Sequence, residues 1–214
     1  MKRMIIAAVA CLVSVLSGCA MQPARSDLST FYAHQPRSIV VVPVVNNTTE
    51  ISASPVFVAT VTRPLAERGY YVFPVYLTEL VLRDFGLAEA GHIHLLPTQR
   101  LYELFGADSV LFVTIKDWST KYVVFASTVT VEMDYELKDT RTGTLLWEST
   151  QQVVQSSGGS GGGLIGMAVA AAINAMATDY QPLARQANNQ VFLPPKGLPA
   201  GPYHPEYGKD RGKF

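Results

Sequence analysis

Cysteine is scarce in this sequence. Only Cys11 and Cys19 occur among 214 residues, so no cysteine follows residue 19. This excludes a disulfide framework and a thiolate nucleophile from the rest of the chain. The fold must therefore depend on an ordinary hydrophobic core, and 48% of the residues are hydrophobic.

Charge of either sign is also sparse. The chain has 17 basic and 17 acidic residues, which together make 16% of the sequence and give a formal net charge of zero. No basic cluster stands out. We therefore expect neither a nucleic-acid partner nor a polybasic surface that binds anionic lipid.

A long hydrophobic run is missing as well. A helix needs roughly 20 apolar residues to cross a hydrocarbon core of ~30 Å, whereas the N-terminal run from Met4 to Leu16 has 13. Lys2 and Arg3 precede this run, and small residues follow it. This pattern predicts a cleaved signal peptide over residues 1–18 and not a permanent span.

The residues Leu16-Ser17-Gly18-Cys19 match the bacterial lipobox at all four positions. The resemblance implies cleavage between Gly18 and Cys19, a diacylglyceryl group on the Cys19 thiol, and a further acyl chain such as palmitate on the new amine. Several chains, at ~0.8 kcal/mol per buried methylene, anchor a protein stably. Ala20 replaces the aspartate that typically retains such proteins in the inner membrane, which favours the outer membrane. The alternative is an ordinary signal with Cys19 near the cut by chance.

Removing the leader leaves enough residues for one domain, with 15 basic against 17 acidic side chains. Residues 19–35 show no clear period and are expected to form a lipidated tether that, at ~3.4 Å per residue, reaches roughly 50 Å. Residues 36–192 are expected to form a single α/β domain. Residues 193–214 are rich in Pro and Gly, which predicts a tail that is disordered or lies across the domain surface.

The domain begins with a β-branched run from Ser38, apolar on both faces, which predicts a buried central strand that Pro43 ends or distorts. Ser54-Pro55 starts a helix expected to reach Arg68, with Pro64 kinking or splitting it. The remaining patterns before the hairpin predict a strand over Tyr70–Val75, helices over Thr78–Phe85 and Pro97–Phe105, and a strand over Ser109–Ile115.

The clearest pattern is the alternation of apolar and polar residues from Ser127 to Lys138, which predicts a long strand with one wet face. The turn falls at Asp139–Gly143. The returning strand has one face formed by Leu145, Trp147, Ser149, Gln151 and Val153. The predicted fold class is α/β: a small mixed sheet with a long antiparallel hairpin, flanked by helices.

One motif of the sequence is typical of a serine hydrolase. Gly158, Ser160 and Gly162 match the Gly-x-Ser-x-Gly of a serine esterase, with Asp179 and His204 following in hydrolase order. The match lies in a tract composed almost entirely of Gly and Ser, where it arises by composition. No catalytic residue is therefore predicted, and the esterase is a remote alternative.

His92 and His94 are two residues apart, but a zinc site needs further ligands at recognisable spacing. They are expected to be polar residues of a loop, and neither a metal nor a cofactor is predicted. Glu132, Asp134 and Glu136 are expected to form the solvated face of a strand and not a glycosidase pair.

The segment from Gly162 to Ala177 is apolar and rich in small residues. Gly162, Gly166 and Ala170 recur at a small-xxx-small spacing, which lets helices approach closely. Two interpretations stay open: a buried helix of the domain, or a surface for self-association or membrane contact. These three residues are the predicted oligomer contact.

Two stretches resemble modules of the bacterial envelope: Asp139-Thr-Arg-Thr-Gly-Thr-Leu-Leu-Trp147 and Ile39-Val-Val-Val-Pro-Val-Val-Asn-Asn-Thr48. Similar modules are found in the curli-secretion lipoprotein, the penicillin-binding-protein activator lipoproteins and the N-terminal domain of the Tol-system periplasmic protein. With the lipobox, the apolar Gly-rich segment and the Pro-rich tail, the chain resembles an outer-membrane lipoprotein family of unknown function. The resemblance implies a mixed sheet flanked by helices and a curli-secretion-like lipoprotein as partner; it implies no catalytic residues.

The leading hypothesis is a lipid-anchored periplasmic module, not an enzyme, that takes part in an outer-membrane assembly or in a secretion or transport system. Its predicted contacts are outer-membrane lipid through Cys19 and another envelope lipoprotein. The alternative is a subunit that oligomerises into an export pore.

Overall fold

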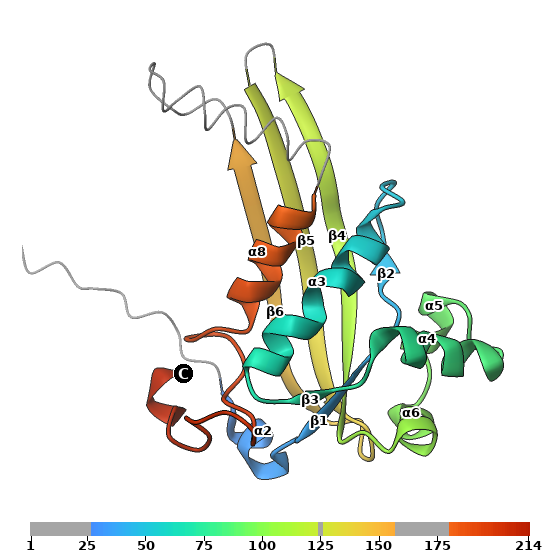
Figure 1. Cartoon of the computed structure of the whole chain (residues 1–214), viewed down its shortest axis with the longest axis vertical. Helices are drawn as coiled ribbons and strands as arrows, with labels where there is room; N and C mark the ends of the chain where they lie inside the picture. Colours follow the sequence, from blue (N-terminus) through green and yellow to red (C-terminus); the bar gives the residue numbers. More distant parts are fainter. Residues whose placement is uncertain (1–26, 124–125, 157–179) are drawn as a thin grey trace, which may run out of the picture.

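The computed structural model describes residues 27–123, 126–156 and 180–214. In this part of the chain a mixed sheet lies between two groups of helices (Figure 1). The strands follow the order β3-β1-β4-β5-β6, and β2 pairs with β4 off this path. The predicted fold class is confirmed.

The strands are β1 (Ser38–Val41), β2 (Val45–Asn46), β3 (Tyr71–Val72), β4 (Ser109–Val123), β5 (Ala126–Asp139) and β6 (Leu145–Ser156). The helices are α2 (Ser29–His34), α3 (Ala53–Glu67), α4 (Val75–Asp84), α5 (Ala90–His94), α6 (Thr98–Phe105) and α8 (Gln181–Val191), followed by the 3-10 helix η2 (Arg211–Lys213). Within the described residues, none of the helices is sufficiently long and apolar to cross a membrane.

The parallel half of the sheet is built around β1, which pairs in parallel with both β3 and β4. Its residues Ile39, Val40 and Val41 are buried, as expected for a strand covered on both faces. The strand ends before Pro43, which has no N–H for the ladder. The chain pairs again with β4 at Val45, confirming the predicted interruption.

The antiparallel half consists of β4, β5 and β6, and it contains the predicted hairpin. In β5 the alternation is confirmed: Val129, Val131, Met133, Tyr135 and Leu137 are all buried. The intervening polar residues are partly exposed on the opposite face. One face of this half of the sheet is therefore apolar and the other is wet.

Each face of the sheet has its own core. Helices α2, α3 and α8 cover one face, where Phe57 of α3 and Leu183 of α8 pack against residues such as Tyr135. Helices α4, α5 and α6 cover β1 and the start of β4 on the other face, around Leu82 and Ile93. Burying each large apolar side chain of this kind contributes about 1.5–3 kcal/mol.

Helix α3 continues through Pro64 without splitting, which differs from one of the predicted outcomes. Phe57, Val61 and Leu65 on either side of the proline are fully buried on the same core. This shared packing holds the two halves of the helix together although Pro64 donates no hydrogen bond.

Three local assignments differ from the prediction. The strand before α4 has only two residues, because α4 already starts at Val75, directly after Pro74. His92 and His94 lie on the short helix α5 and not in a loop. Leu145 is 40% exposed and does not share the buried face of Trp147, because a bulge at the start of β6 pairs Lys138 with Leu145 but Leu137 with Trp147.

Both ends of the described chain are more ordered than the sequence suggested. Residues expected in the tether form α2, because Leu28 and Phe31, three residues apart, are buried in the core beneath α3 and α8. Of the two alternatives for the tail, the structure has the one in which it lies on the domain. Leu198 and Phe214 of this segment are buried.

Candidate functional site

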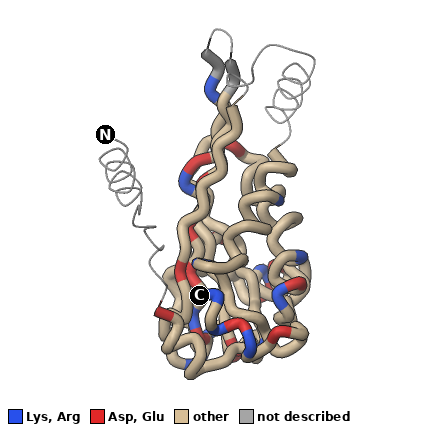
Figure 2. The backbone as a smooth tube through the Cα atoms, turned by 90° about the vertical axis from the view of Figure 1, so that its left-hand side faces the viewer, with Lys and Arg blue, Asp and Glu red and all other residues tan. Residues whose placement is uncertain are grey.

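The wet face of the antiparallel strands, here called the open face, is formed by polar side chains of β4, β5 and β6 on the side away from α3 and α8. Helices α4 to α6 cover only the part of this side next to β1 and the start of β4 (Figure 1). The charged members of the open face are Lys116, Asp117, Lys121, Glu132, Asp134, Glu136, Lys138 and Glu148. Acidic residues outnumber basic ones here, and Figure 2 shows charged positions spaced along the extended strands.

Most of these charges are engaged with one another. Lys116 Nζ lies 3.2 Å from Asp134 Oδ2, and the Thr150 hydroxyl donates to Asp134 Oδ1 at 2.7 Å. Lys138 pairs with Glu136, and Gln152 Nε2 donates to Glu132 Oε2 at 2.7 Å. Because these pairs are partly exposed, each contributes only about 0–1 kcal/mol to stability.

Glu136 and Glu148 stand directly opposite each other in the register of β5 and β6. Like charges in this arrangement repel. Lys138 compensates Glu136, whereas Glu148 has no ion-pair partner among the residues that the structure describes. A shallow depression lined by Asp134, Glu136, Glu148 and Thr150 surrounds this pair. The geometry favours a positively charged group arriving from outside the chain.

An apolar groove of ≈ 390 Å³ lies at the end of β1, between the first turns of α3 and α4. Its walls include Val42, Val44, Val58 and Val75, and Glu79 is the one charged residue of its lining. The groove lies at the carboxyl end of β1, and the carboxyl ends of parallel strands are a common location for ligands in α/β sheets. No nucleophile with an adjacent base lines it.

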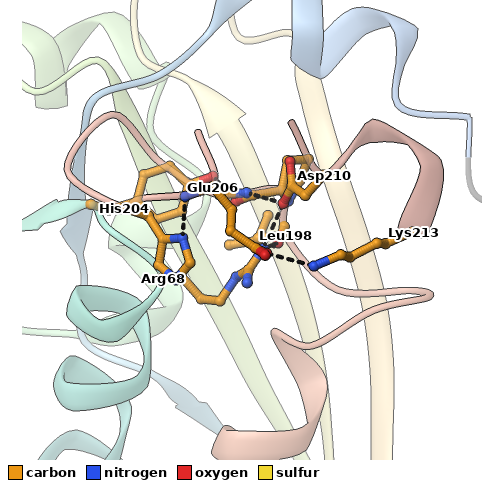
Figure 3. Close-up of polar contacts among 9 residues, drawn as sticks. Arg68, Leu198, His204, Glu206, Asp210 and Lys213 are labelled. Carbon is orange, nitrogen blue, oxygen red and sulfur yellow. Dashed lines mark hydrogen bonds and ion pairs between the residues drawn. The ribbon is translucent and has the colours of Figure 1, made fainter. Parts of the chain in front are cut away.

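A buried ion pair fastens the tail to α3. Arg68 Nη2 lies 3.1 Å from Asp210 Oδ2, and both side chains are almost wholly buried (Figure 3). Arg68 also donates to the Leu198 carbonyl oxygen from Nε at 3.0 Å and from Nη2 at 2.6 Å. The Ala200 N–H donates to Asp210 Oδ2 at 2.7 Å. These bonds offset much of the desolvation cost of burying two charges.

Tyr70 and Gly69 complete this attachment. The Tyr70 hydroxyl donates to the Pro199 carbonyl oxygen at 2.6 Å, and burial raises the pKa of Tyr70 well above its ordinary value. Gly69 has φ +84°, and a Cβ there would lie 2.5 Å from the backbone nitrogen of His204. The close approach of the tail therefore requires glycine at position 69.

A cavity of ≈ 110 Å³ lies between α2 and the tail. The hydroxyl of Tyr32 and Oδ1 of Asp210 are buried and have no hydrogen-bond partner in the described structure. The guanidinium of Arg211 lies 4.4 Å from the centre of the Tyr32 ring. Burial is the main cause that raises the pKa of Tyr32, followed by the charge of Asp210.

The residues predicted for lipidation and cleavage, Cys19 and Gly18, lie outside the described residues. The predicted oligomer contact at Gly162, Gly166 and Ala170 and the esterase residues Gly158, Ser160 and Asp179 do so too. His204 is described: its Nδ1 accepts the Glu206 N–H at 3.1 Å within a turn of the tail.

The two histidines do not form a joint site. His94 Nε2 donates to the Pro43 carbonyl oxygen at 3.0 Å, and its ring packs edge-on against Phe112. Burial is the main cause that lowers the pKa of His94. His92 is exposed. Within residues 27–123, 126–156 and 180–214, no group of three potential ligands is arranged to hold a metal ion.

Sequence reasoning placed Glu132, Asp134 and Glu136 correctly on the wet face. It missed Arg68 and Asp210, because a contact across 142 residues leaves no local pattern. It also missed the opposition of Glu136 and Glu148, which depends on the register that follows from the bulge in β6.

Comparisons with known proteins give the family. A family profile described as "Putative lipoprotein GNA1162-like" matches residues 26–203. The chain is 35% identical over 178 residues to a relative from Neisseria meningitidis serogroup B (strain ATCC BAA-335 / MC58) named "Putative lipoprotein NMB1124/NMB1162". The match covers 83% of this chain and 82% of that protein.

One solved structure agrees with this result. The crystal structure of lipoprotein GNA1162 from Neisseria meningitidis is 35% identical, with a TM-score of 0.56, and the match covers 67% of this chain and all of that chain. A PelC dodecamer from Paraburkholderia phytofirmans is 18% identical, with a TM-score of 0.43, over 75% of this chain and 95% of that one. The expected resemblance to a lipoprotein family is confirmed, and the chain belongs to the GNA1162-like lipoprotein family.

Proposed function

We propose that this protein is a lipid-anchored, non-enzymatic module of the bacterial envelope. Acyl chains on Cys19 hold it to the outer membrane, and the domain works in the periplasm. There its open face docks onto a basic surface of another envelope lipoprotein, within an assembly, secretion or transport complex.

The observation that carries this proposal is the unbalanced charge at Glu136 and Glu148. The two carboxylates lie opposite each other on neighbouring strands. Among the described residues, Lys138 forms an ion pair with Glu136, and no cation forms one with Glu148. An arginine or lysine from a partner relieves this repulsion and forms a charge-assisted hydrogen bond. Electrostatic complementarity of this kind gives specificity and accelerates association.

The lipobox and the family description support the anchored part of the proposal. Lipidation limits diffusion to the membrane surface, so a docking face of modest affinity is sufficient when its partner is anchored in the same membrane. The described polar clusters provide ion pairs and hydrogen bonds, and the bonded rings of His34, His94 and His204 contact backbone groups and not a hydroxyl.

Mild crosslinking in native membranes, followed by purification and mass spectrometry, tests the proposal. The variant Glu148→Lys reverses the uncompensated charge, while Glu67→Lys reverses an exposed charge on α3, on the other side of the sheet. We expect the wild type and Glu67→Lys to recover the same envelope lipoprotein and Glu148→Lys to lose it. Recovery of the monomer alone from wild-type membranes contradicts the proposal, as does equal recovery of the partner with Glu148→Lys.

A further inference from the structure

The two edges of the sheet differ in length. Strand β3 forms one edge with two residues, whereas β6 forms the other with 12. Natural sheets protect their edges with short strands, proline, lysine or a covering element. The short β3 is protected in this way. Strand β6 contains neither proline nor lysine, and Glu148 is its one charged residue.

The hydrogen bonds of the turn fix which backbone groups of β6 point outward. The Asp139 N–H donates to the Thr144 carbonyl oxygen, and the Asp139 carbonyl oxygen accepts the Gly143 N–H, both at 2.9 Å. The backbone N–H and C=O groups of Asp139 therefore point toward β6. Because the direction of these groups alternates from one residue to the next along an antiparallel strand, the odd-numbered residues of β5 point theirs toward β6.

The register then assigns the residues of β6. Met133 lies opposite Gln151, and Val131 lies opposite Val153, so odd-numbered residues of β6 bond to β5. The even-numbered residues Thr150, Gln152 and Val154 direct their N–H and C=O groups away from the sheet. The Gln151 side chain donates to the Gln152 carbonyl oxygen at 3.3 Å, which agrees with an outward carbonyl.

This edge has no strand beside it in the described part of the chain. No backbone hydrogen bond there joins Thr150, Gln152 or Val154 to a segment other than β5. Helix α8 packs on the face of the sheet and not along the edge, and β6 is the outermost strand (Figure 1). Val154 is 51% exposed.

We propose that a second copy of this chain pairs with this edge, β6 against β6, antiparallel about a two-fold axis at Gln152. Residues opposed in an antiparallel pair share a face of the sheet, so the axis must pass through a residue position. An axis at Gln152 places Thr150 opposite the partner's Val154, and each such pair exchanges two backbone bonds.

Charge and symmetry favour a second copy as the occupant. With the axis at Gln152, the two Glu148 carboxylates are eight residues apart along the ladder, roughly 27 Å at ~3.4 Å per residue. The edge is otherwise uncharged, so it repels no identical strand. The same patch on both copies closes the assembly as a dimer, the commonest symmetric oligomer. Edge pairing leaves the open face accessible, so this inference goes beyond the docking proposed above.

Sedimentation of the full-length lipidated chain in detergent tests the dimer. Gln152→Pro removes an outward N–H in both copies and leaves the bonds to β5 in place. Gln152→Ala is the matched control, because it loses the same side chain and keeps the N–H. We expect a dimer for the wild type and for Gln152→Ala, and a dissociation constant at least about tenfold higher for Gln152→Pro. A wild type that stays monomeric at tens of micromolar contradicts the proposal, as does a proline variant that dimerises like the wild type.

Oxidative crosslinking in native membranes gives a second measurement that does not need the proline variant to fold. Hydrogen-bonded partners have Cα atoms about 5.5 Å apart, within the range of a disulfide. Gln152→Cys should therefore form a disulfide dimer, and Glu148→Cys should not. Equal crosslinking of the two variants overturns the pairing. So does a Gln152→Cys chain that stays monomeric together with a wild-type monomer whose backbone amide at Gln152 is protected from exchange, since another segment of the same chain then covers the edge.

Discussion

Arg68 and Asp210 are separated by 142 residues and form a buried ion pair, with Arg68 Nη2 3.1 Å from Asp210 Oδ2. The pair joins the end of α3 to the tail, and both partners also bond to backbone atoms of the tail. The tail is therefore part of the folded domain in energetic terms.

Replacing Asp210 with alanine leaves the Arg68 guanidinium buried without its counter-charge. Removing one partner of a buried pair costs about 3–5 kcal/mol, so the free energy of unfolding in urea should fall by that amount. Lys213→Ala serves as control, because its pair with Glu206 is half exposed and contributes about 0–1 kcal/mol. Similar decreases in the free energy of unfolding for the two variants would show that the buried pair contributes no more to stability than the exposed pair.

Gly69→Ala should destabilise the protein more than Gly86→Ala. Both glycines have positive φ, which costs a residue with a Cβ roughly 1–2 kcal/mol. A Cβ at position 69 also meets the backbone of His204, and overpacking of this kind adds about 1–3 kcal/mol. At Gly86 nothing lies within 4 Å of the added carbon. Thermal unfolding of the two variants measures the difference, and equal melting temperatures would contradict the close approach of the tail.

His94 should make stability depend on pH below neutrality. Burial lowers its pKa in the folded state below the 6.5 of the unfolded chain. As the pH falls through 6.5, the unfolded state binds a proton before the folded state does, so the free energy of unfolding decreases. It continues to decrease until the pH passes the folded pKa.

Comparing unfolding at pH 7.5 and pH 5.5 checks this expectation. His94→Gln should show a smaller decrease than the wild type, while His92→Gln should retain the full decrease, because His92 is exposed. If the free energy of unfolding of His94→Gln decreased between these pH values as much as that of the wild type, the pH dependence would belong to other groups.

Cys19→Ala should release the protein from the membrane. Without the thiol, no diacylglyceryl group is attached, and the acyl chains that provide stable anchoring are lost. Fractionation should find the wild type with outer membranes and the variant in the soluble fraction or as uncleaved precursor. Mass spectrometry of the wild-type N-terminal peptide should show the acylated Cys19. An unmodified Cys19 in a membrane-bound wild type would refute the lipid anchor.

The features that could be predicted from the sequence are those with local signals. Alternation from Val129 to Leu137 determines which face of β5 is buried, and Gly106, with φ +64°, ends α6 as expected. Pro43 interrupts the first strand because it lacks an N–H. Each of these effects depends on a residue and its near neighbours.

The features that were missed depend on distant partners. Leu28 and Phe31 are isolated apolar residues in a polar stretch, and only the core beneath α3 and α8 explains why they form a helix. The bulge before Trp147 changes which face Leu145 occupies, and no local composition indicates it. The pairing of Arg68 with Asp210 could not be predicted from the sequence, because the tail that contains Asp210 has no periodic pattern.

Site-specific photocrosslinking from position 148 in native membranes tests the docking claim most directly. A photoreactive residue at Glu148 should give one prominent adduct with another envelope lipoprotein, and the same residue at Glu67 should not. Adducts to lipid or solvent alone at position 148, or the same protein adduct from both positions, would contradict docking through the open face.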